Sequence, residues 1–308
     1  MLVKRSLLAA NIETTYGTSS SPGVNDVVRA ENIELSLSEG ARMHERPAHR
    51  GSLGSLKHIY GGSLASISFD VPVAGSGTAG TAPEFGDLLR SCGLDETVVA
   101  STSVAYAPVS TGMESCTISF YEDGTLYVLT GCRGNVSLTG EAGKYAVLSF
   151  SMTGHIAGPT DAAIISGVFP TTVPPVMVGA TFTIDSFSGV IGNLTMDLQN
   201  QLALPPSVNA ADGYAAIRIT GRDVIGTIDP EMELVATENW VGNWRSGAEM
   251  ALATGTIGAT AGNRWALSHP AVSYREVSRG DRDGIRTVEL SYGAAEDSGD
   301  DEIELIFT

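Results

Sequence analysis

The sequence predicts a mainly β protein built from two copies of one domain. Of its 308 residues, 36 are glycine and 13 are proline, a composition that suits short strands joined by many turns. Apolar and polar residues alternate with a period of two in several segments, which is the pattern of strands buried on one face. The order of these segments recurs in the second half of the chain, and 308 residues are enough for two domains.

Alternation marks the strands of the first half. Residues 27–37 place Ile33 and Leu35 opposite polar neighbours, so this segment predicts a strand with one buried face. Residues 64–73 alternate in the same way, and Pro72 indicates an edge or the end of that strand. Further strands are predicted over residues 116–121, 125–129, 135–138 and 145–152, the first two joined by a hairpin turn at Asp123-Gly124.

A short flanking helix is predicted over residues 82–92. Its apolar residues share one face: Phe85, Leu88, Leu89 and Cys92. Thr81 and Glu84 have the spacing of a capping box, and Gly93 stands where a left-handed residue commonly ends a helix. The helix therefore has both a start and a stop signal.

The second half repeats this order. Residues 193–198 resemble residues 32–37, which lie 161 positions earlier in the chain. Asp229 likewise matches Asp70, which lies 159 positions earlier. A second helical stretch is predicted over residues 238–252. The last strands are matched less closely: residues 288–291 with 136–139, and residues 303–307 with 145–150.

We therefore predict a tandem duplication, with domains over residues 1–157 and 158–308 and a break near Gly158-Pro159. Residues 1–25 are expected to form an N-terminal arm that orders on assembly. The alternative is that strand and helix order recurs by chance, because residue identity between the copies is low.

The charge balance excludes two classes of function. The chain has 18 basic and 35 acidic residues, a formal net charge of -17, which repels phosphate and anionic lipid. We therefore expect no specific binding to nucleic acid and no membrane association. No apolar segment has the length of a signal peptide or a transmembrane span. Cys92, Cys116 and Cys132 lack zinc-site spacing and are expected to be buried, reduced thiols.

No catalytic, cofactor or metal site is predicted. Residues 75–80 read Gly-Ser-Gly-Thr-Ala-Gly, a literal dinucleotide fingerprint, but the predicted helix begins after the last glycine and Asp95 precedes the next strand-like run. We interpret this loop as flexible or interface-forming. Residues 61–65 lack the last glycine of a hydrolase elbow, and the histidines and carboxylates lack metal-ligand spacing.

Two stretches of opposite charge predict head-to-tail self-association. The loop over residues 39–62 is basic, and the last 13 residues are strongly acidic. The predicted contact residues between stacked copies are Arg42, Arg46, Arg50, Lys57, Asp300, Asp301 and Glu302. The alternative is an ordinary solvated loop and an ordinary acidic tail.

Four runs of sequence resemble a known family. They are Leu-Leu-Ala-Ala-Asn-Ile-Glu-Thr-Thr-Tyr-Gly-Thr at residues 7–18, the glycine loop and helix at 74–94, Tyr-Ala-Pro at 106–108, and Gly-Cys-Arg-Gly-Asn at 131–135. In these runs the chain is similar to major tail tube proteins of tailed, siphophage-type phages. The resemblance covers residues 5–154, and it reaches the second half through the internal repeat.

The resemblance implies a structural virion protein and no enzyme. Tube domains of this family are β-sandwiches or barrels with one flanking helix, and six domains close a ring around a DNA conduit. Because two domains per chain supply six from three chains, we predict a trimeric, pseudo-sixfold ring that stacks into the virion tail after assembly in the host cytoplasm. The implied partners are further copies of this chain, the tape-measure protein, the tail terminator and the distal tail protein, while genomic DNA passes through unbound.

An alternative from another class is a β-sandwich tail-tip or decoration protein that binds a cell-surface carbohydrate. It predicts a monomer or closed trimer with an aromatic-lined groove. Trp240, Trp244 and Trp265 are the candidate aromatics for such a groove, although the helical spacing of Trp240 and Trp244 is more typical of core residues.

Overall fold

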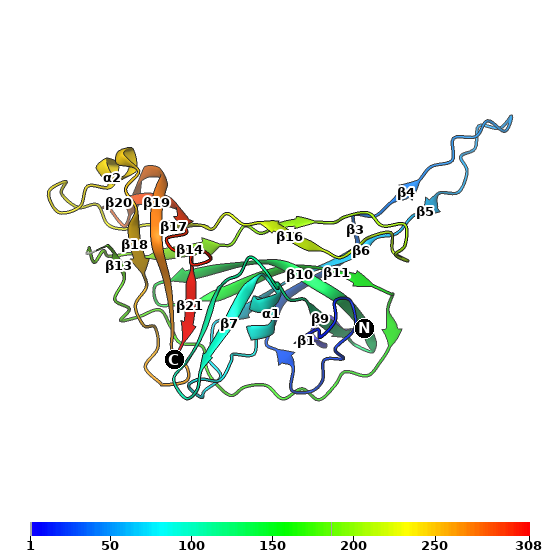
Figure 1. Ribbon diagram of the computed structural model, residues 1–308, viewed down its shortest axis with the longest axis horizontal. Helices are drawn as coiled ribbons and strands as arrows, with labels where there is room; N and C mark the ends of the chain where they lie inside the picture. Colours follow the sequence, from blue (N-terminus) through cyan, green and yellow to red (C-terminus); the bar gives the residue numbers. More distant parts are fainter. Residues whose placement is uncertain (1, 186) are drawn as a thin grey trace.

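The computed structural model describes residues 2–185 and 187–308 and is mainly β, which confirms the predicted fold class (Figure 1). The elements of the first half are β1 (Ser6–Ile12), β2 (Val27–Val28), β3 (Glu31–Glu39), β4 (Met43–His44), β5 (Ile59–Tyr60), β6 (Leu64–Pro72), α1 (Gly86–Ser91), β7 (Leu94–Val99), β8 (Ser103–Pro108), β9 (Cys116–Glu122), β10 (Thr125–Glu141) and β11 (Val147–Ile156).

The second half follows along an extended segment. Its elements are β12 (Thr160–Asp161), β13 (Thr183–Ile184), β14 (Asn193–Asp197), β15 (Gln201–Ala203), β16 (Arg218–Gly221), β17 (Ile225–Ile228), α2 (Trp240–Ser246), β18 (Met250–Ala253), β19 (Trp265–Arg282), β20 (Ile285–Ala295) and β21 (Glu304–Phe307).

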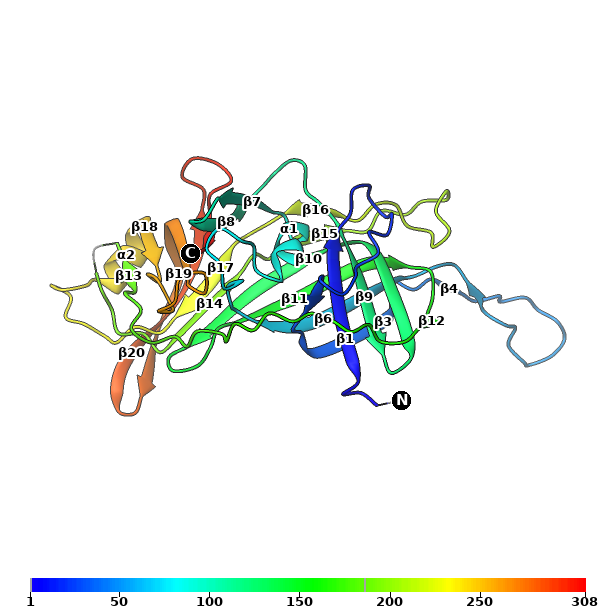
Figure 2. The same ribbon diagram turned by 90° about the horizontal axis from the view of Figure 1, so that it is seen from below.

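One antiparallel sheet, which we call the spine sheet, runs through both halves. Its strands follow the order β3, β6, β11, β10, β14, β17, β20, β19, and Figure 2 shows them crossing the molecule side by side. The same order of four strands is thus met twice, once in each half. The ladder between β10 and β14 joins the two sets.

The repeated pairing order supports the predicted duplication, and local contacts agree with it. The Asn32 amide donates to Asp70 Oδ2 at 2.9 Å, and the Asn193 amide donates to Asp229 Oδ2 at 3.3 Å. These two pairs join β3 to β6 and β14 to the end of β17. The division into two domains stays a prediction.

The matching of the last strands is wrong. Residues 288–291 lie in β20, which pairs with β17 as β11 pairs with β6, so β20 is the counterpart of β11 and not of β10. By the same order β19 is the counterpart of β10. Residues 304–307 form β21, which instead bridges β19 and β8 of the first half. Short alternating runs resemble one another, so only the pairing decides which strands correspond.

A second layer covers the inner face of the spine sheet. In Figure 1, α1, β1 and β9 lie below β6, β10 and β11. The largest hydrophobic cluster contains residues from both halves, and at the centre of the contact Phe307 lies edge-on to Phe85 and Tyr106, with ring centroids 5.6 and 6.1 Å away. The two halves therefore share one continuous core, where the length of the chain allows two.

Residues 6–12 do not form a separate arm. They form β1, which pairs with β9 along its whole length and buries Leu8 and Ala9. After β1, the buried Glu13 carboxylate accepts hydrogen bonds from Ser115, Thr117 and two backbone amides. The expected N-terminal arm is thus wrong for this segment, because its apolar residues complete the core.

Both predicted helices are shorter than expected. α1 begins at Gly86, and the Glu84 carboxylate accepts from Arg29 at 2.8 Å instead of closing a capping box with Thr81. Gly93 follows the helix with φ +82°, as predicted. α2 covers only residues 240–246, where Asn239 caps its start, and residues 250–253 form β18. The two strands predicted over 125–129 and 135–138 are one strand, β10, with an irregularity between Leu129 and Cys132.

The glycine loop over residues 75–80 is a contact between the two halves. The Gly75 amide donates to Asn263 Oδ1 at 2.8 Å, and the Gly77 amide donates to the Gly262 carbonyl at 2.9 Å. A Cβ atom at Gly75 would lie 2.2 Å from that Gly262 oxygen, so only glycine allows the two backbones to meet. Of the two interpretations of this loop, flexible or interface-forming, the contacts support the second, with the interface lying between the two halves of one chain.

Other sequence expectations concern the cysteines and the membrane. Cys92, Cys116 and Cys132 are buried free thiols, as predicted. Burial raises the pKa of Cys92 and of Cys132 well above the ordinary value, so these thiols stay protonated. Within the described ranges, no helix is long and apolar enough to span a membrane.

Replacing Gly75 tests the contact between the halves. We expect Gly75→Ala to lower the free energy of unfolding by about 1–3 kcal/mol, because the added methyl group forces two backbones apart. Gly54→Ala is the matched control, since its Cβ would meet only Ser52 Oγ at 3.6 Å. Urea denaturation compares the two. Equal stability of both variants would show that the loops do not pack this closely.

Acid should destabilise the core of the second half through His269. This side chain is fully buried, its Nδ1 donates to the Glu302 carbonyl at 2.7 Å, and burial lowers its pKa to about 4 from an ordinary value near 6.5. Because the unfolded chain binds the proton more tightly, the titration of His269 leaves the free energy of unfolding unchanged above about pH 6.5 and lowers it by roughly 3 kcal/mol as the pH drops to 4. His269→Gln keeps an N–H donor without the titration, so chemical denaturation across this pH range should show a shallower decline for the variant. Parallel declines would contradict the assignment.

Candidate functional site

The outer face of the spine sheet is a continuous polar surface. In β6 and β11 apolar and polar residues alternate, so that Phe69 and Phe150 are buried while Ser68 and Ser151 lie on the outer face. The rows continue across the junction: Thr139, Thr195, Thr227, Ser291 and Glu276 stand opposite one another in turn. Sequence alternation thus places hydroxyl groups in register over both halves.

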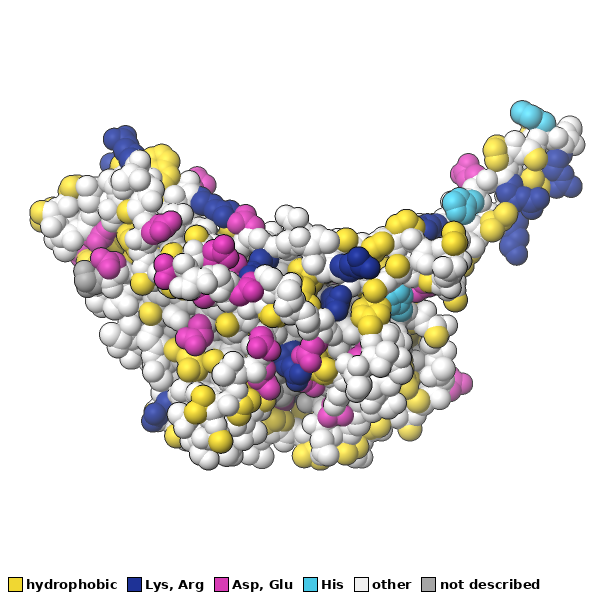
Figure 3. Space-filling view, viewed as in Figure 1, with side chains coloured by type: hydrophobic (Ala, Val, Ile, Leu, Met, Phe, Trp, Pro, Cys, Tyr) yellow, Lys and Arg dark blue, Asp and Glu magenta, His cyan; other side chains and the backbone are white. Residues whose placement is uncertain are grey.

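Carboxylates dominate the charge of this face. The strand pairing places the following carboxylates in line with the residues of the outer face: Glu34, Asp70, Glu141, Asp197, Asp229, Glu231, Glu276 and Glu289. Arg282 also lies on this face, where it pairs with Asp229 and Glu231 at 3.1 Å each. Because α1, β1 and β9 cover the opposite face, this acidic surface lies on the side where Figure 3 shows the outline of the molecule hollowed, between α2 and the upper right end.

The junction between β10 and β14 defines how one half continues into the next. Ser137 pairs with Asp197 and Glu141 pairs with Asn193, and the Asn135 amide supports the ladder by donating to Asp197 Oδ1 at 2.7 Å. At the two ends of the spine sheet the equivalent edges are open. Over the described residues, no strand pairs with the outer edge of β3 or with the outer edge of β19 over residues 276–282.

Residues 40–62, which we call the arm, project from the body between β3 and β6 (Figure 1). The arm carries the short ladder of β4 and β5. Figure 3 shows basic and histidine side chains gathered on it, away from the acidic residues of the body. Arg46, Arg50 and Lys57, three of the predicted contact residues, are exposed on the arm. Arg42 lies at its base, with its guanidinium 4.2 Å from the centre of the Tyr214 ring.

The predicted acidic partners are engaged within the chain. Arg222 forms ion pairs with Asp300 and with Glu302, and the interactions of Asp300 with Ser110 and Arg222 lower the pKa of its carboxyl. Asp301 accepts from the amides of its own turn. The structure does not bring the arm and this turn together in one chain, so contact between copies stays a prediction.

A second long insertion was not predicted from the sequence. Residues 198–224, which we call the hairpin, contain β15 and β16 and leave the sheet between β14 and β17, as the arm does between β3 and β6. Unlike the arm, the hairpin lies on the first half of its own chain. The internal repeat contained the signal, because each long insertion separates the same two strands.

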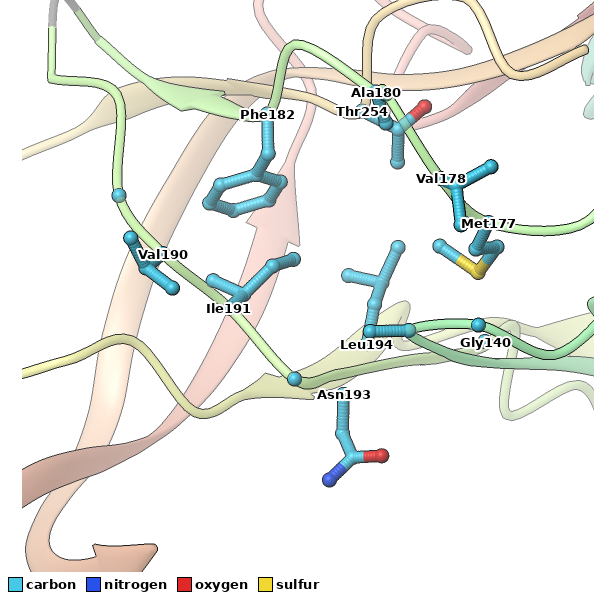
Figure 4. A pocket seen from close by; sticks show the side chains of 15 residues that line it. Gly140, Met177, Val178, Ala180, Phe182, Val190, Ile191, Asn193, Leu194 and Thr254 are labelled. Atoms are coloured by element: carbon cyan, nitrogen blue, oxygen red, sulfur yellow. The ribbon is translucent and has the colours of Figure 1, made fainter. Parts of the chain in front are cut away.

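The described residues were compared with the ligand sets that metal ions require. No group of three or more His, Cys, Asp and Glu side chains that suits a metal ion occurs there. A cavity of about 430 Å³ lies beside the junction, but Met177, Phe182, Ile191 and Leu194 make its walls apolar (Figure 4). The three tryptophans do not form the aromatic groove that the alternative interpretation requires. Trp240 and Trp265 are core residues, and of the three only Trp244 is substantially exposed.

The sequence was compared with known protein families and with curated proteins. A family model described as phage tail tube protein matches residues 4–304, nearly the whole chain. The comparison with curated proteins finds no match for this sequence. A match over both halves covers the spine sheet, the arm and the hairpin together, so the chain belongs to the phage tail tube protein family.

Proposed function

We propose that this chain is the major tail tube subunit, a structural protein without catalysis, and that three copies close a pseudo-sixfold ring. The rings stack head to tail into the DNA conduit of a phage tail. The observation that carries this proposal is the ladder between β10 and β14, because it joins two equivalent halves edge to edge and leaves the equivalent edges of β3 and β19 open. An unpaired edge is a ready template for another copy.

The internal junction supplies a register for the junction between copies. Strand pairing makes Ser278 the counterpart of Ser137, and Ser36 the counterpart of Asp197. Since Ser137 pairs with Asp197, Ser278 of one copy should pair with Ser36 of the next. A heterologous contact of this kind forms a ring when its rotation closes. If each half turns the sheet by one sixth of a circle, three copies close it.

The polar face of the spine sheet is proposed to line the conduit. It lies on the hollow side of the molecule, and its carboxylates outnumber its basic groups. Fixed negative charge repels the DNA backbone within a Debye length of about 8–10 Å, while hydroxyl groups keep the wall wetted. DNA therefore passes without adsorbing.

The remaining partners follow from the family. The tape-measure protein, tail terminator and distal tail protein would meet the inside and the two ends of the tube. The location would be the virion tail, after assembly in the host cytoplasm, with no role for a membrane. These assignments are supported by the family match over residues 4–304.

A pair of cysteines tests the junction between copies. We expect Ser36→Cys/Ser278→Cys to form disulfide-linked dimers and trimers under mild oxidation, because directly opposed strand residues have the Cα separation that a disulfide requires. Non-reducing gels measure the product, and electron microscopy of end-on views counts the copies in a ring. The three native cysteines are buried and should not interfere.

The control moves one cysteine by one residue. Leu37→Cys/Ser278→Cys should not cross-link, since a one-residue shift turns the side chain to the other face of the sheet. Equal cross-linking by both variants would contradict the register. A protein that never forms rings or tubes at any concentration, with neither pair cross-linking, would overturn the proposed function.

A further inference from the structure

The hairpin and the arm are counterparts that have different surroundings. Each leaves the spine sheet between equivalent strands and contains a two-stranded ladder of its own. The hairpin starts after β14 and lies on the first half, whose β10 is the strand that β14 pairs with. The arm starts after β3, whose outer edge is open. The seat of the hairpin therefore shows where the arm should lie when β3 is paired.

Polar contacts hold the hairpin in its seat. The Asn200 amide donates to the carbonyl of Cys92, directly after α1, at 2.6 Å and to that of Gly134 in β10 at 3.0 Å. Farther along, Arg133 donates to the Ile217 carbonyl at 2.7 Å. The hairpin thus lies across the C-terminal end of α1 and the middle of β10.

Apolar contacts complete the seat. Tyr214 and Ile217 of the hairpin are buried against Leu64 at the start of β6. These side chains leave solvent only because the first half lies beneath them. The arrangement is a docked element and not a free loop.

The arm lacks a comparable seat within its own chain. Its side chains Met43, Leu53, Ile59 and Tyr60 are exposed by 52 to 109%, and Figure 1 shows the arm extending beyond the body. Large apolar side chains on a projecting basic segment indicate a surface that another molecule covers. Its contacts with its own chain lie at the base, where Arg42 meets Tyr214.

We propose that the arm of one copy lies across the second half of the neighbouring copy in the same ring, at the C-terminal end of α2, as the hairpin lies across the first half. This inference rests on the proposed ring, because it requires β3 of one copy to pair with β19 of the next. The counterpart of the Cys92 position is Gly247, directly after α2. That of Gly134 is Tyr274, next to Arg275 at the irregularity of β19.

The second half offers a matching surface at this place. Its apolar part is Trp244, which is 40% exposed on α2 and whose indole N–H donates to the Arg275 carbonyl at 3.2 Å. Arg275 forms an ion pair with Asp223, and the neighbouring Val224 carbonyl accepts from Ala294, shortly before Glu296. We call the exposed side chains of this region the receiving surface: Asp223, Val241, Trp244, Glu249, Glu296 and Asp297.

The chemistry of the two surfaces is complementary. The arm presents Arg46, Arg50 and Lys57 beside Ile59 and Tyr60, all of them exposed. The receiving surface presents the exposed carboxylates of Glu249, Glu296 and Asp297, with Asp223 held by Arg275, together with the exposed apolar side chains of Trp244 and Val241. Opposite charge steers and orients the contact, while the apolar side chains gain by leaving water. In contrast, Asp300 and Glu302 are already paired with Arg222 and have less to offer a basic arm.

Carbodiimide cross-linking tests where the arm lies. The reagent joins lysines to carboxylates in contact, and Lys57 is the lysine of the arm, Lys4 and Lys144 being the other two in the sequence. Rings are assembled from isotope-labelled and unlabelled protein, cross-linked, and digested for mass spectrometry. We expect mixed-isotope links from Lys57 to Glu249, Glu296 or Asp297, and we expect them in single rings as well as in tubes.

Two outcomes would overturn the inference. One is Lys57 linked to Asp300 or Asp301 in tubes but not in single rings, which would place the arm on a stacked ring instead. The other is a Lys57 that stays unlinked and freely acetylated in single rings. Both outcomes leave the Ser36–Ser278 cross-link intact, so they are distinguishable from failure of the ring itself.

A charge exchange supplies an independent readout. We expect Arg46→Glu/Arg50→Glu to raise the protein concentration needed for ring assembly roughly tenfold, as two or three exposed ion pairs would. Adding Glu249→Lys/Glu296→Lys should restore assembly. Adding Asp95→Lys/Asp161→Lys, two exposed carboxylates elsewhere, should not. Folding is followed by circular dichroism, and equal rescue by both pairs would contradict the proposed seat.

Discussion

The ladder between β10 and β14 is the interaction on which the rest of the structure depends. It converts two short sheets into the spine sheet, and it carries the rows of hydroxyl and carboxylate side chains from one half into the other. It also brings the halves close enough for β21 to pair with β8 and for Phe307 to contact Phe85. One continuous core is the consequence.

The same ladder explains how a chain can carry its own template for assembly. An internal junction is bound covalently, so its partners are present at high effective concentration and form it first. The proposed junction between copies would use the equivalent edges of β3 and β19 without the covalent link. The proposed ring and the proposed seat of the arm are therefore repetitions of contacts that the chain already makes with itself, in the β10–β14 ladder and in the hairpin.

Much of the candidate surface was accessible from the sequence, and the reason is periodicity. Alternation in residues 64–73 separates Ser68 and Asp70 from Ile67 and Phe69, and this separation places the former on the polar face. The basic arm was found because charge is visible in sequence. The ion pairs of Asp300 and Glu302 could not be predicted, because their partner Arg222 lies about 80 residues away and only the fold brings it near.

The sequence by itself determined the strand-rich fold class, the short helices, the buried thiols and the repeat of β3 and β6 in β14 and β17, since these depend on local composition and on a period of two. Only the tertiary structure decided which late strands correspond, that residues 6–12 belong to the core, and that Gly75 meets Gly262. These features depend on pairing between residues far apart in the chain. A short alternating run fits many partners equally well, and the choice among them is made by packing.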